Sequence, residues 1–153
     1  MSPDILGPHA GLVVGARALL KPRERRDAKL FLVEGPQAVR EALEAGIVRT
    51  LFVDHTRQAV VDEFGAEATA FVTSRAIESL SDTEQPQGVV AVCAMPSQSL
   101  IDVLRGDPKL VVVCHEVNDP GNLGTIIRTA DAAGASGIIL TGQCCDPFAP
   151  DCV

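Results

Sequence analysis

Short apolar runs alternate with amphipathic segments over the first 94 residues of the chain. The apolar runs predict four strands, at residues 30–33, 48–53, 68–72 and 89–94. The segments before and between them predict four helices, at residues 9–20, 36–45, 56–64 and 75–80. Ser74 is the expected N-cap of the last helix. Because the strands are apolar on both faces, the pattern predicts a sheet covered by helices on both sides.

A strand–turn–helix–strand order is predicted near the end of the chain. Apolar runs at residues 110–117 and 137–140 flank a turn rich in Gly and Asn and a helix of small apolar residues. The helix begins near Asp119, which precedes Pro120, and Asn122 is a competing N-cap. This order predicts a βαβ unit with its chemistry at the carboxyl end of the first strand.

These two patterns divide the chain into two domains. Residues 95–99 have the composition of a hinge, and residues 100–105 predict a helical turn. We therefore expect a first domain at residues 1–95, a linker at 96–108 and a second domain at 109–153.

The composition of the 153 residues is that of a soluble globular protein, with 46% hydrophobic and 22% charged residues. No apolar run approaches the roughly 20 residues that span a bilayer, so no membrane partner is expected. The first residues lack the basic and apolar segments of a secretory signal, which makes a cytoplasmic location the expectation. The five cysteines include no C-x-x-C pair, so we expect them to pack as small hydrophobic residues, without a metal or disulfide.

The charge is unevenly distributed. A net charge of -7 argues against a nucleic-acid partner, yet five Lys and Arg residues lie between positions 21 and 29, against two acidic residues. This basic loop can bind phosphate locally, or it can simply be a solvated connection between a helix and a strand. The candidate phosphate contacts within it are Arg23, Arg25, Arg26 and Lys29.

The turn before the last predicted helix matches neither G-x-G-x-x-G nor the P-loop pattern, so its glycines do not indicate a nucleotide site by spacing. Its helix start can bind an anion, or Asn122 and the glycines can serve only capping and close packing. Arg128 is the only basic residue after Lys109. It can pair with Asp131 on the helix surface, or it can face the turn and act on a phosphate or a hydroxyl.

The run from Asp119 to Ala130, DPGNLGTIIRTA, resembles the first motif of the SpoU (TrmH-type) RNA 2′-O-ribose methyltransferases, which belong to the SPOUT superfamily of knotted enzymes. Residues 26–35, 39–46 and 85–92 are similar to the N-terminal substrate-binding domain of that family. The resemblance covers nearly all of residues 15–142. It implies an α/β chain with a ribosomal-protein-like first domain, followed by the first part of a knotted, Rossmann-like methyltransferase domain.

The same resemblance implies a function. It predicts methylation of a ribose 2′-hydroxyl, on ribosomal RNA, with S-adenosylmethionine as cofactor. Arg128 matches the family's arginine, which acts on the 2′-hydroxyl, and Asn122 matches the asparagine that helps to build the site. The basic loop falls where the substrate-binding domain meets RNA phosphates. Full-length members of the family are homodimers.

The second and third motifs of the family, which form the knot and bind S-adenosylmethionine, are expected after residue 142. The eleven residues at 143–153 contain neither motif, so the resemblance implies a family member cut short, with no knot, no cofactor-binding element and no catalysis in this chain. We accordingly expect residues 1–94 to fold stably and residues 109–153 to be loosely held or paired with another copy. Two alternatives stay open: an RNA-binding module without catalysis, and a flavodoxin-like nucleotide binder.

Overall fold

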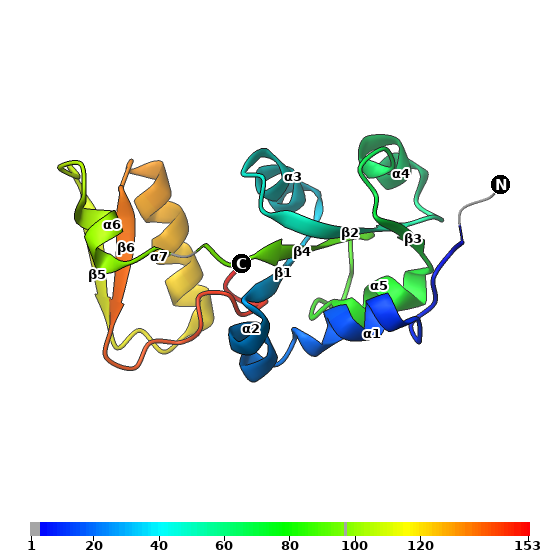
Figure 1. Cartoon of the computed structure of the whole chain (residues 1–153), viewed down its shortest axis with the longest axis horizontal. Helices are drawn as coiled ribbons and strands as arrows, with labels where there is room; N and C mark the ends of the chain where they lie inside the picture. Colours follow the sequence, from blue (N-terminus) through cyan, green and yellow to red (C-terminus); the bar gives the residue numbers. More distant parts are fainter. Residues whose placement is uncertain (1–3, 97) are drawn as a thin grey trace. The chain divides into compact units, whose positions relative to one another are not determined.

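The computed structural model describes residues 4–96 and 98–153. These residues form two compact units, the first ending at Met95 and the second beginning at Pro96 (Figure 1).

A four-stranded mixed sheet forms the centre of the first unit. Its strands are β1 (Leu30–Glu34), β2 (Val48–Asp54), β3 (Ala70–Val72) and β4 (Val89–Ala94). They lie in the order β1-β4-β2-β3; β4 is antiparallel to both of its neighbours, and β2 is parallel to β3. The central position of β4 explains its unbroken apolar sequence, because both of its faces are buried.

Helices cover both faces of this sheet, as the sequence pattern predicts (Figure 1). The five helices are α1 (Gly11–Ala18), α2 (Pro22–Ala28), α3 (Pro36–Glu44), α4 (Gln58–Phe64) and α5 (Ser74–Leu80). One face packs against α1 and α5 around the buried Phe52. Helices α3 and α4 lie on the other face (Figure 1). Alternate residues of each strand point to opposite faces, so one strand contributes to both halves of the core.

The basic segment after α1 is a helix, and its prediction as a loop was wrong. Helix α2 has Pro22 in its first turn and ends at Lys29, which adopts a left-handed conformation with φ of 56°. Pro22 restricts the backbone of the residue before it, Lys21, which is extended. The fixed φ of Pro22 itself suits the first turn of a helix. The N-cap of α5 is likewise one residue earlier than predicted. The side chain of Thr73, not Ser74, accepts a hydrogen bond from the backbone N–H of Ala76.

The second unit contains α6 (Leu100–Leu104), β5 (Val111–His115), α7 (Pro120–Ala132) and β6 (Gly137–Thr141). Strands β5 and β6 are parallel and pair in register from Val111 opposite Gly137 to His115 opposite Thr141, which confirms the predicted βαβ order. The core of this unit is built around Cys114, Leu123 and Cys152. Helix α6 falls within residues predicted as a linker, and the side chain of its Val103 lies against Gly137 of β6.

Several large apolar side chains of the second unit lie at the surface: Leu100, Ile101, Leu104, Leu110 and Val113. The sheet of this unit has two strands among the described residues, so β5 has a neighbour on one side only. An unpaired strand edge of this kind can pair with a further strand.

The cysteines contribute to packing. Cys93, Cys114 and Cys152 are buried. Burial raises the pKa of the Cys93 thiol to about 11 and also raises the pKa of Cys152, so both thiols are protonated at neutral pH. None of the helices formed by residues 4–96 and 98–153 has the length and apolar character needed to cross a membrane.

Candidate functional site

The turn between β5 and α7 positions the residues of the predicted catalytic motif. Asp119 has an extended backbone, and its Oδ1 accepts a hydrogen bond from the backbone N–H of Asn122 at 2.7 Å. Asp119 is therefore the N-cap of α7, and Pro120 occupies the first turn. Asn122 lies inside the helix, and its exposed side-chain amide has no hydrogen-bond partner within the described part of the chain. This amide is available to a ligand.

Arg128 lies on the exposed side of α7 and points back toward the start of the helix. Its Nη2 donates a hydrogen bond to Thr125 Oγ1 at 3.4 Å, and its Nη1 lies 3.2 Å from the place that a Cβ on Gly124 would occupy. The predicted alternative, an ion pair with Asp131, was wrong: among the described residues Arg128 forms no ion pair. Helical side chains lean toward the N-terminus, which explains this direction.

The exposed side chains of Asn122, Thr125 and Arg128 form one row along α7, because they follow one another at three-residue spacing. The opposite side of the helix is apolar and contributes Leu123 to the core of the second unit. The fold therefore holds a planar cation and an amide on the solvent side of a helix whose other side is anchored.

Gly124 allows the segment after β6 to approach α7. A Cβ on this residue would lie 2.7 Å from the backbone oxygen of Cys152, closer than real Cβ contacts. Gly124 is buried, whereas Arg128, one turn later, is exposed. The close-packing role expected for a glycine of this turn is thus confirmed at Gly124.

The other polar groups at this edge of the second unit bind one another. His115 Nδ1 and Thr141 Oγ1 are 3.0 Å apart, and Asn118 Nδ2 donates to the backbone oxygen of Glu116 at 3.1 Å. With these groups engaged, the described residues do not present a donor and acceptor set that fits S-adenosylmethionine. They supply groups suited to the substrate side of a reaction, namely Asn122 and Arg128.

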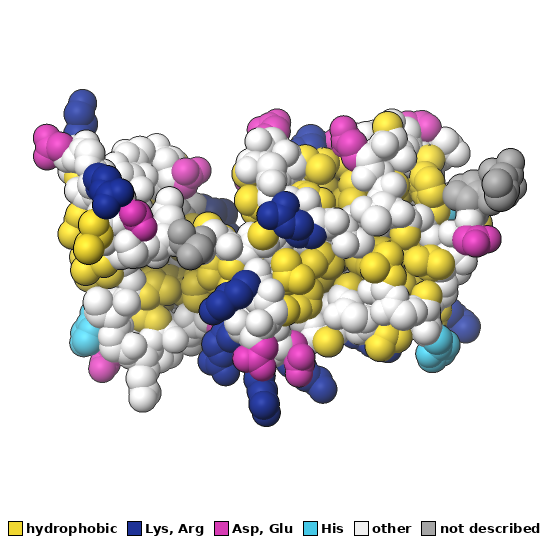
Figure 2. All heavy atoms as spheres, viewed as in Figure 1, with side chains coloured by type: hydrophobic (Ala, Val, Ile, Leu, Met, Phe, Trp, Pro, Cys, Tyr) yellow, Lys and Arg dark blue, Asp and Glu magenta, His cyan; other side chains and the backbone are white. Residues whose placement is uncertain are grey.

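The predicted phosphate contacts on α2 differ in their exposure to solvent. Arg23, Arg26 and Lys29 are exposed, and Figure 2 shows Lys and Arg side chains gathered over α2 with acidic side chains beside them. Arg23 also forms an exposed ion pair with Asp27 at 3.6 Å, which contributes little to stability.

Arg25 differs from these residues because only 2% of it is exposed. Its Nη1 donates to the backbone oxygens of Leu19 and Leu20, at 2.8 and 2.9 Å. These carbonyl groups lie at the end of α1, where helical partners are lacking. Arg25 thus has a structural role here, and an RNA contact by Arg25 stays a prediction.

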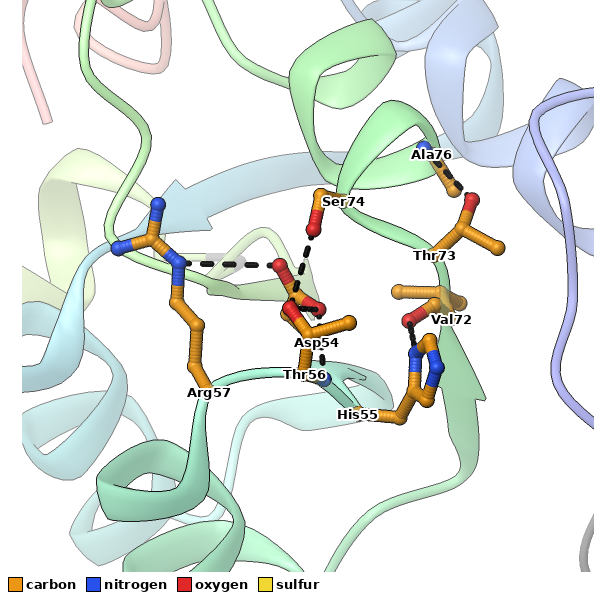
Figure 3. Close-up of polar contacts among 8 residues, drawn as sticks. All are labelled: Asp54, His55, Thr56, Arg57, Val72, Thr73, Ser74 and Ala76. Carbon is orange, nitrogen blue, oxygen red and sulfur yellow. Dashed lines mark hydrogen bonds and ion pairs between the residues drawn. The ribbon is translucent and has the colours of Figure 1, made fainter.

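A polar cluster at the end of β2 was missed by the sequence analysis (Figure 3). Asp54 is 1% exposed, and its Oδ1 accepts hydrogen bonds from the backbone N–H and the hydroxyl of Thr56, at 3.0 and 2.8 Å. Thr56 Oγ1 lies 3.1 Å from Ser74 Oγ, and Arg57 Nε lies 3.7 Å from Asp54 Oδ2. The signal was an Asp-x-Thr sequence after an apolar strand, which is typical of a side-chain–backbone turn.

The environment lowers the pKa of Asp54 below its ordinary value of 3.8. Burial by itself raises this pKa, but the hydrogen bonds from Thr56 and Ser74 and the charge of Arg57 together outweigh it. The carboxylate is therefore charged at neutral pH although it is buried.

Asp54→Asn is expected to lower the free energy of unfolding by about 1–3 kcal/mol at pH 7, because buried donors lose a charged acceptor. The unfolded chain takes up this proton first as the pH falls, since the pKa in the folded protein is the lower one. The stabilisation is thus complete well above pH 3.8 and is lost as the pH falls below 3.8 through the folded-state pKa. Urea unfolding at pH 7 and at several values below pH 4 measures the difference. The exposed Asp62→Asn is the control, and an equal effect of both variants would contradict the assignment.

The fold and this site define a class of protein: an α/β first domain followed by a βαβ unit whose helix holds an exposed amide and an exposed guanidinium. Residues 13–91 match the MRM3-like substrate binding domain, and residues 109–153 match the SpoU rRNA Methylase family. The chain belongs to the SpoU rRNA methylase family, with an MRM3-like substrate-binding domain. The resemblance and the fold class predicted from the sequence are thereby confirmed.

Named relatives agree with this assignment. The chain is 39% identical over 128 residues to the 23S rRNA (guanosine(2553)-2'-O)-methyltransferase RlmP of Bacillus subtilis, covering 82% of the chain and 49% of the relative. It is 31% identical over 138 residues to the human mitochondrial rRNA methyltransferase 3, covering 85% of the chain and 33% of the relative. The chain therefore spans between a third and a half of the length of these relatives.

Solved structures give the same result. An AdoMet-bound rRNA methyltransferase from Sinorhizobium meliloti has a TM-score of 0.79 at 34% identity, over 97% of this chain and 58% of that one. The SpoU methyltransferase AviRb from Streptomyces viridochromogenes, in complex with AdoMet, has a TM-score of 0.80 at 32% identity, over 94% of this chain and 57% of that one.

Proposed function

We propose that the protein to which this chain belongs is an RNA 2′-O-ribose methyltransferase that acts on ribosomal RNA and uses S-adenosylmethionine. The observation that carries the proposal is the row of Asn122, Thr125 and Arg128 on the solvent side of α7, in a chain of the SpoU family. Relatives named as 23S rRNA 2′-O-methyltransferases and solved relatives that hold AdoMet support the substrate and the cofactor.

The chemistry of Arg128 suits this reaction. A ribose 2′-hydroxyl becomes nucleophilic as it loses its proton, so negative charge develops on its oxygen. A guanidinium keeps its charge at every physiological pH, and its planar donors can stabilise that oxygen. Because Arg128 has no acidic partner within the described residues, its charge is not already neutralised. The amide of Asn122 can donate to or accept from the same ribose.

Transfer of a labelled methyl group to a 23S rRNA transcript tests the proposal. The full-length protein is expected to transfer the label from S-adenosylmethionine, and nuclease digestion is expected to yield a 2′-O-methylated nucleoside. Label on a base, or none at all with active cofactor and intact RNA, would contradict the proposal.

A second candidate is an RNA-binding module without catalysis. It is favoured by the match of the first unit to a substrate-binding domain. The candidate phosphate contacts on α2 are the exposed Arg23, Arg26 and Lys29. RNA binding by the full-length protein without methyl transfer would favour this candidate.

The proposal also covers the oligomeric state and the cellular location of the full-length protein. We infer from the family resemblance that the full-length protein is a homodimer and that it acts in the cytoplasm. Sedimentation equilibrium of the purified protein tests the dimer, and fractionation of cells tests the location.

A further inference from the structure

The segment after β2 carries an arginine whose head group is held by a buried carboxylate. The side chain of Arg57 is 49% exposed, whereas its ion-pair partner Asp54 is 1% exposed. The contact involves Nε, which lies 3.7 Å from Asp54 Oδ2. Figure 3 shows the two terminal nitrogens of Arg57 pointing away from Asp54, and they form no hydrogen bond or ion pair within the described residues. One edge of the guanidinium is thus engaged, and the other edge is open.

The stem of Arg57 is held as well. It packs against the backbone of Gly88, since a Cβ at that position would lie 2.5 Å from Arg57 Cδ. Gly88 has a φ of 88°, a conformation that favours glycine, and its backbone oxygen accepts from the N–H of Asp54 at 2.9 Å. Gly88 therefore positions the aliphatic stem of Arg57, and Asp54 positions its guanidinium.

The other carboxylate oxygen of Asp54 is held by hydrogen bonds. Thr56 donates two hydrogen bonds to its Oδ1, and the Thr56 hydroxyl also lies against Ser74 at the start of α5. A carboxylate with this many partners has a single orientation. It therefore determines where the open edge of Arg57 points, which an exposed ion pair between two flexible side chains does not do.

Other polar groups lie at the same end of the sheet. Gly35, which follows β1, donates its N–H to the backbone oxygen of Val89 at the start of β4. The exposed side chain of Gln87 lies beside Gly35, 3.6 Å from where a Cβ would be. The ends of β1 and β2 and the start of β4 meet here, because β4 is antiparallel to both. A guanidinium with one open side and the exposed amide of Gln87 suit the phosphate and the polar edges of an RNA strand.

We propose that Arg57 binds an RNA phosphate and that Asp54 is its positioning residue. This inference rests on the proposed function, and it adds a phosphate site that is separate from the basic residues of α2. The guanidinium offers two terminal donor groups in one plane, which matches the geometry of phosphate oxygens. Because the side chain is already ordered, less conformational entropy is lost when RNA binds.

The test measures binding of the 153-residue chain to a 23S rRNA transcript between 50 and 200 mM KCl. Arg57→Ala is expected to raise Kd about fivefold near 0.1 M salt and to lower the slope of log K against log salt by about 0.7, as for the loss of one phosphate contact. Arg49→Ala is the matched control. It removes the same charge from an exposed residue at the opposite end of β2 and is expected to leave the slope unchanged.

The positioning role of Asp54 is tested by measuring RNA binding of Asp54→Asn with and without Arg57. Asp54→Asn is expected to weaken RNA binding, although it removes a negative charge, because the guanidinium is no longer oriented. In the Arg57→Ala background the same substitution is expected to have no further effect on Kd. Tighter binding by Asp54→Asn would show that the carboxylate only neutralises Arg57, and would overturn the positioning role. If Asp54→Asn unfolds, Arg57→Lys provides the second measurement, since it keeps the charge and loses the Nε contact.

The outcomes separate this inference from the proposed function. Binding by the unmodified chain, with equal slopes for Arg57→Ala and Arg49→Ala, would overturn the Arg57 site and leave the proposed function in place. No binding of 23S rRNA by the unmodified chain or by the full-length protein would overturn both. Thermal melting of each variant verifies that the first unit is folded.

Discussion

Arg128→Ala is expected to lower kcat for RNA methylation by the full-length protein about 10²–10³-fold, the usual effect of losing a donor that stabilises an oxyanion. The structure supports an effect on the reaction and not on folding. Arg128 is exposed, its one hydrogen bond within the described residues is the 3.4 Å contact to Thr125, and the apolar side of α7 does not include it. The thermal midpoint is therefore expected to change little.

The measurement is steady-state methyl transfer to a 23S rRNA transcript at saturating RNA and cofactor, so that kcat is separated from binding. Asp131→Asn is the control on the same helix, because it removes the acid that was one possible partner of Arg128 and that Arg128 does not contact. It is expected to retain activity. Arg128→Lys is expected to recover only part of the rate, since an ammonium lacks the planar pair of donors. Undiminished transfer by Arg128→Ala would overturn the role assigned to this residue.

Phe52→Ala is expected to destabilise the first unit by about 3–5 kcal/mol, which approaches the whole stability of many domains. Phe52 is 0% exposed and lies in the cluster that joins the sheet to α1 and α5. Its removal leaves a cavity between the sheet and the two helices, α1 and α5, that pack on this face. The substitution is also expected to disturb Asp54, two residues further along β2.

Urea unfolding followed by hydrogen exchange of individual amides measures this effect, because it distinguishes the first unit from the second. Leu12→Ala on α1 is the matched control. Leu12 is 45% exposed, and its truncation is expected to cost well under 1 kcal/mol. A comparable loss for the two variants would mean that Phe52 is not a central part of the core.

The strands and most helices of the first unit could be predicted because they depend on local patterns. The run Val89–Ala94 is apolar at every position, which is typical of a strand buried on both faces, and it forms the centre of the sheet. The sequence Asp119-Pro120 likewise carries its own capping chemistry, and Asp119 is the N-cap. The segment at 22–28 was mispredicted because its side chains are charged on nearly every side, so no apolar periodicity marks the helix.

The candidate sites could be predicted only where a local motif carries them. Arg128 and Asn122 could be proposed from the sequence because the whole motif lies within one turn and one helix. The cluster at Asp54 was missed because its members, Thr56, Arg57, Ser74 and Gly88, come from three separate segments. The Asp-x-Thr spacing indicates the contact between Asp54 and Thr56, but nothing in the sequence indicates that Ser74 and Gly88 join them.

The amino-acid sequence by itself determined the alternation of elements, the start of α7 and the family motif, because periodicity, proline and capping side chains act over a few residues. Tertiary structure decided the partner of each charged side chain. It buried Arg25 against the end of α1, directed Arg128 toward Thr125 and not Asp131, and placed Asp54 beneath Arg57. The physical reason is that the environment of a charge depends on groups brought together by folding, whereas the preference for helix or strand is largely a property of the segment itself.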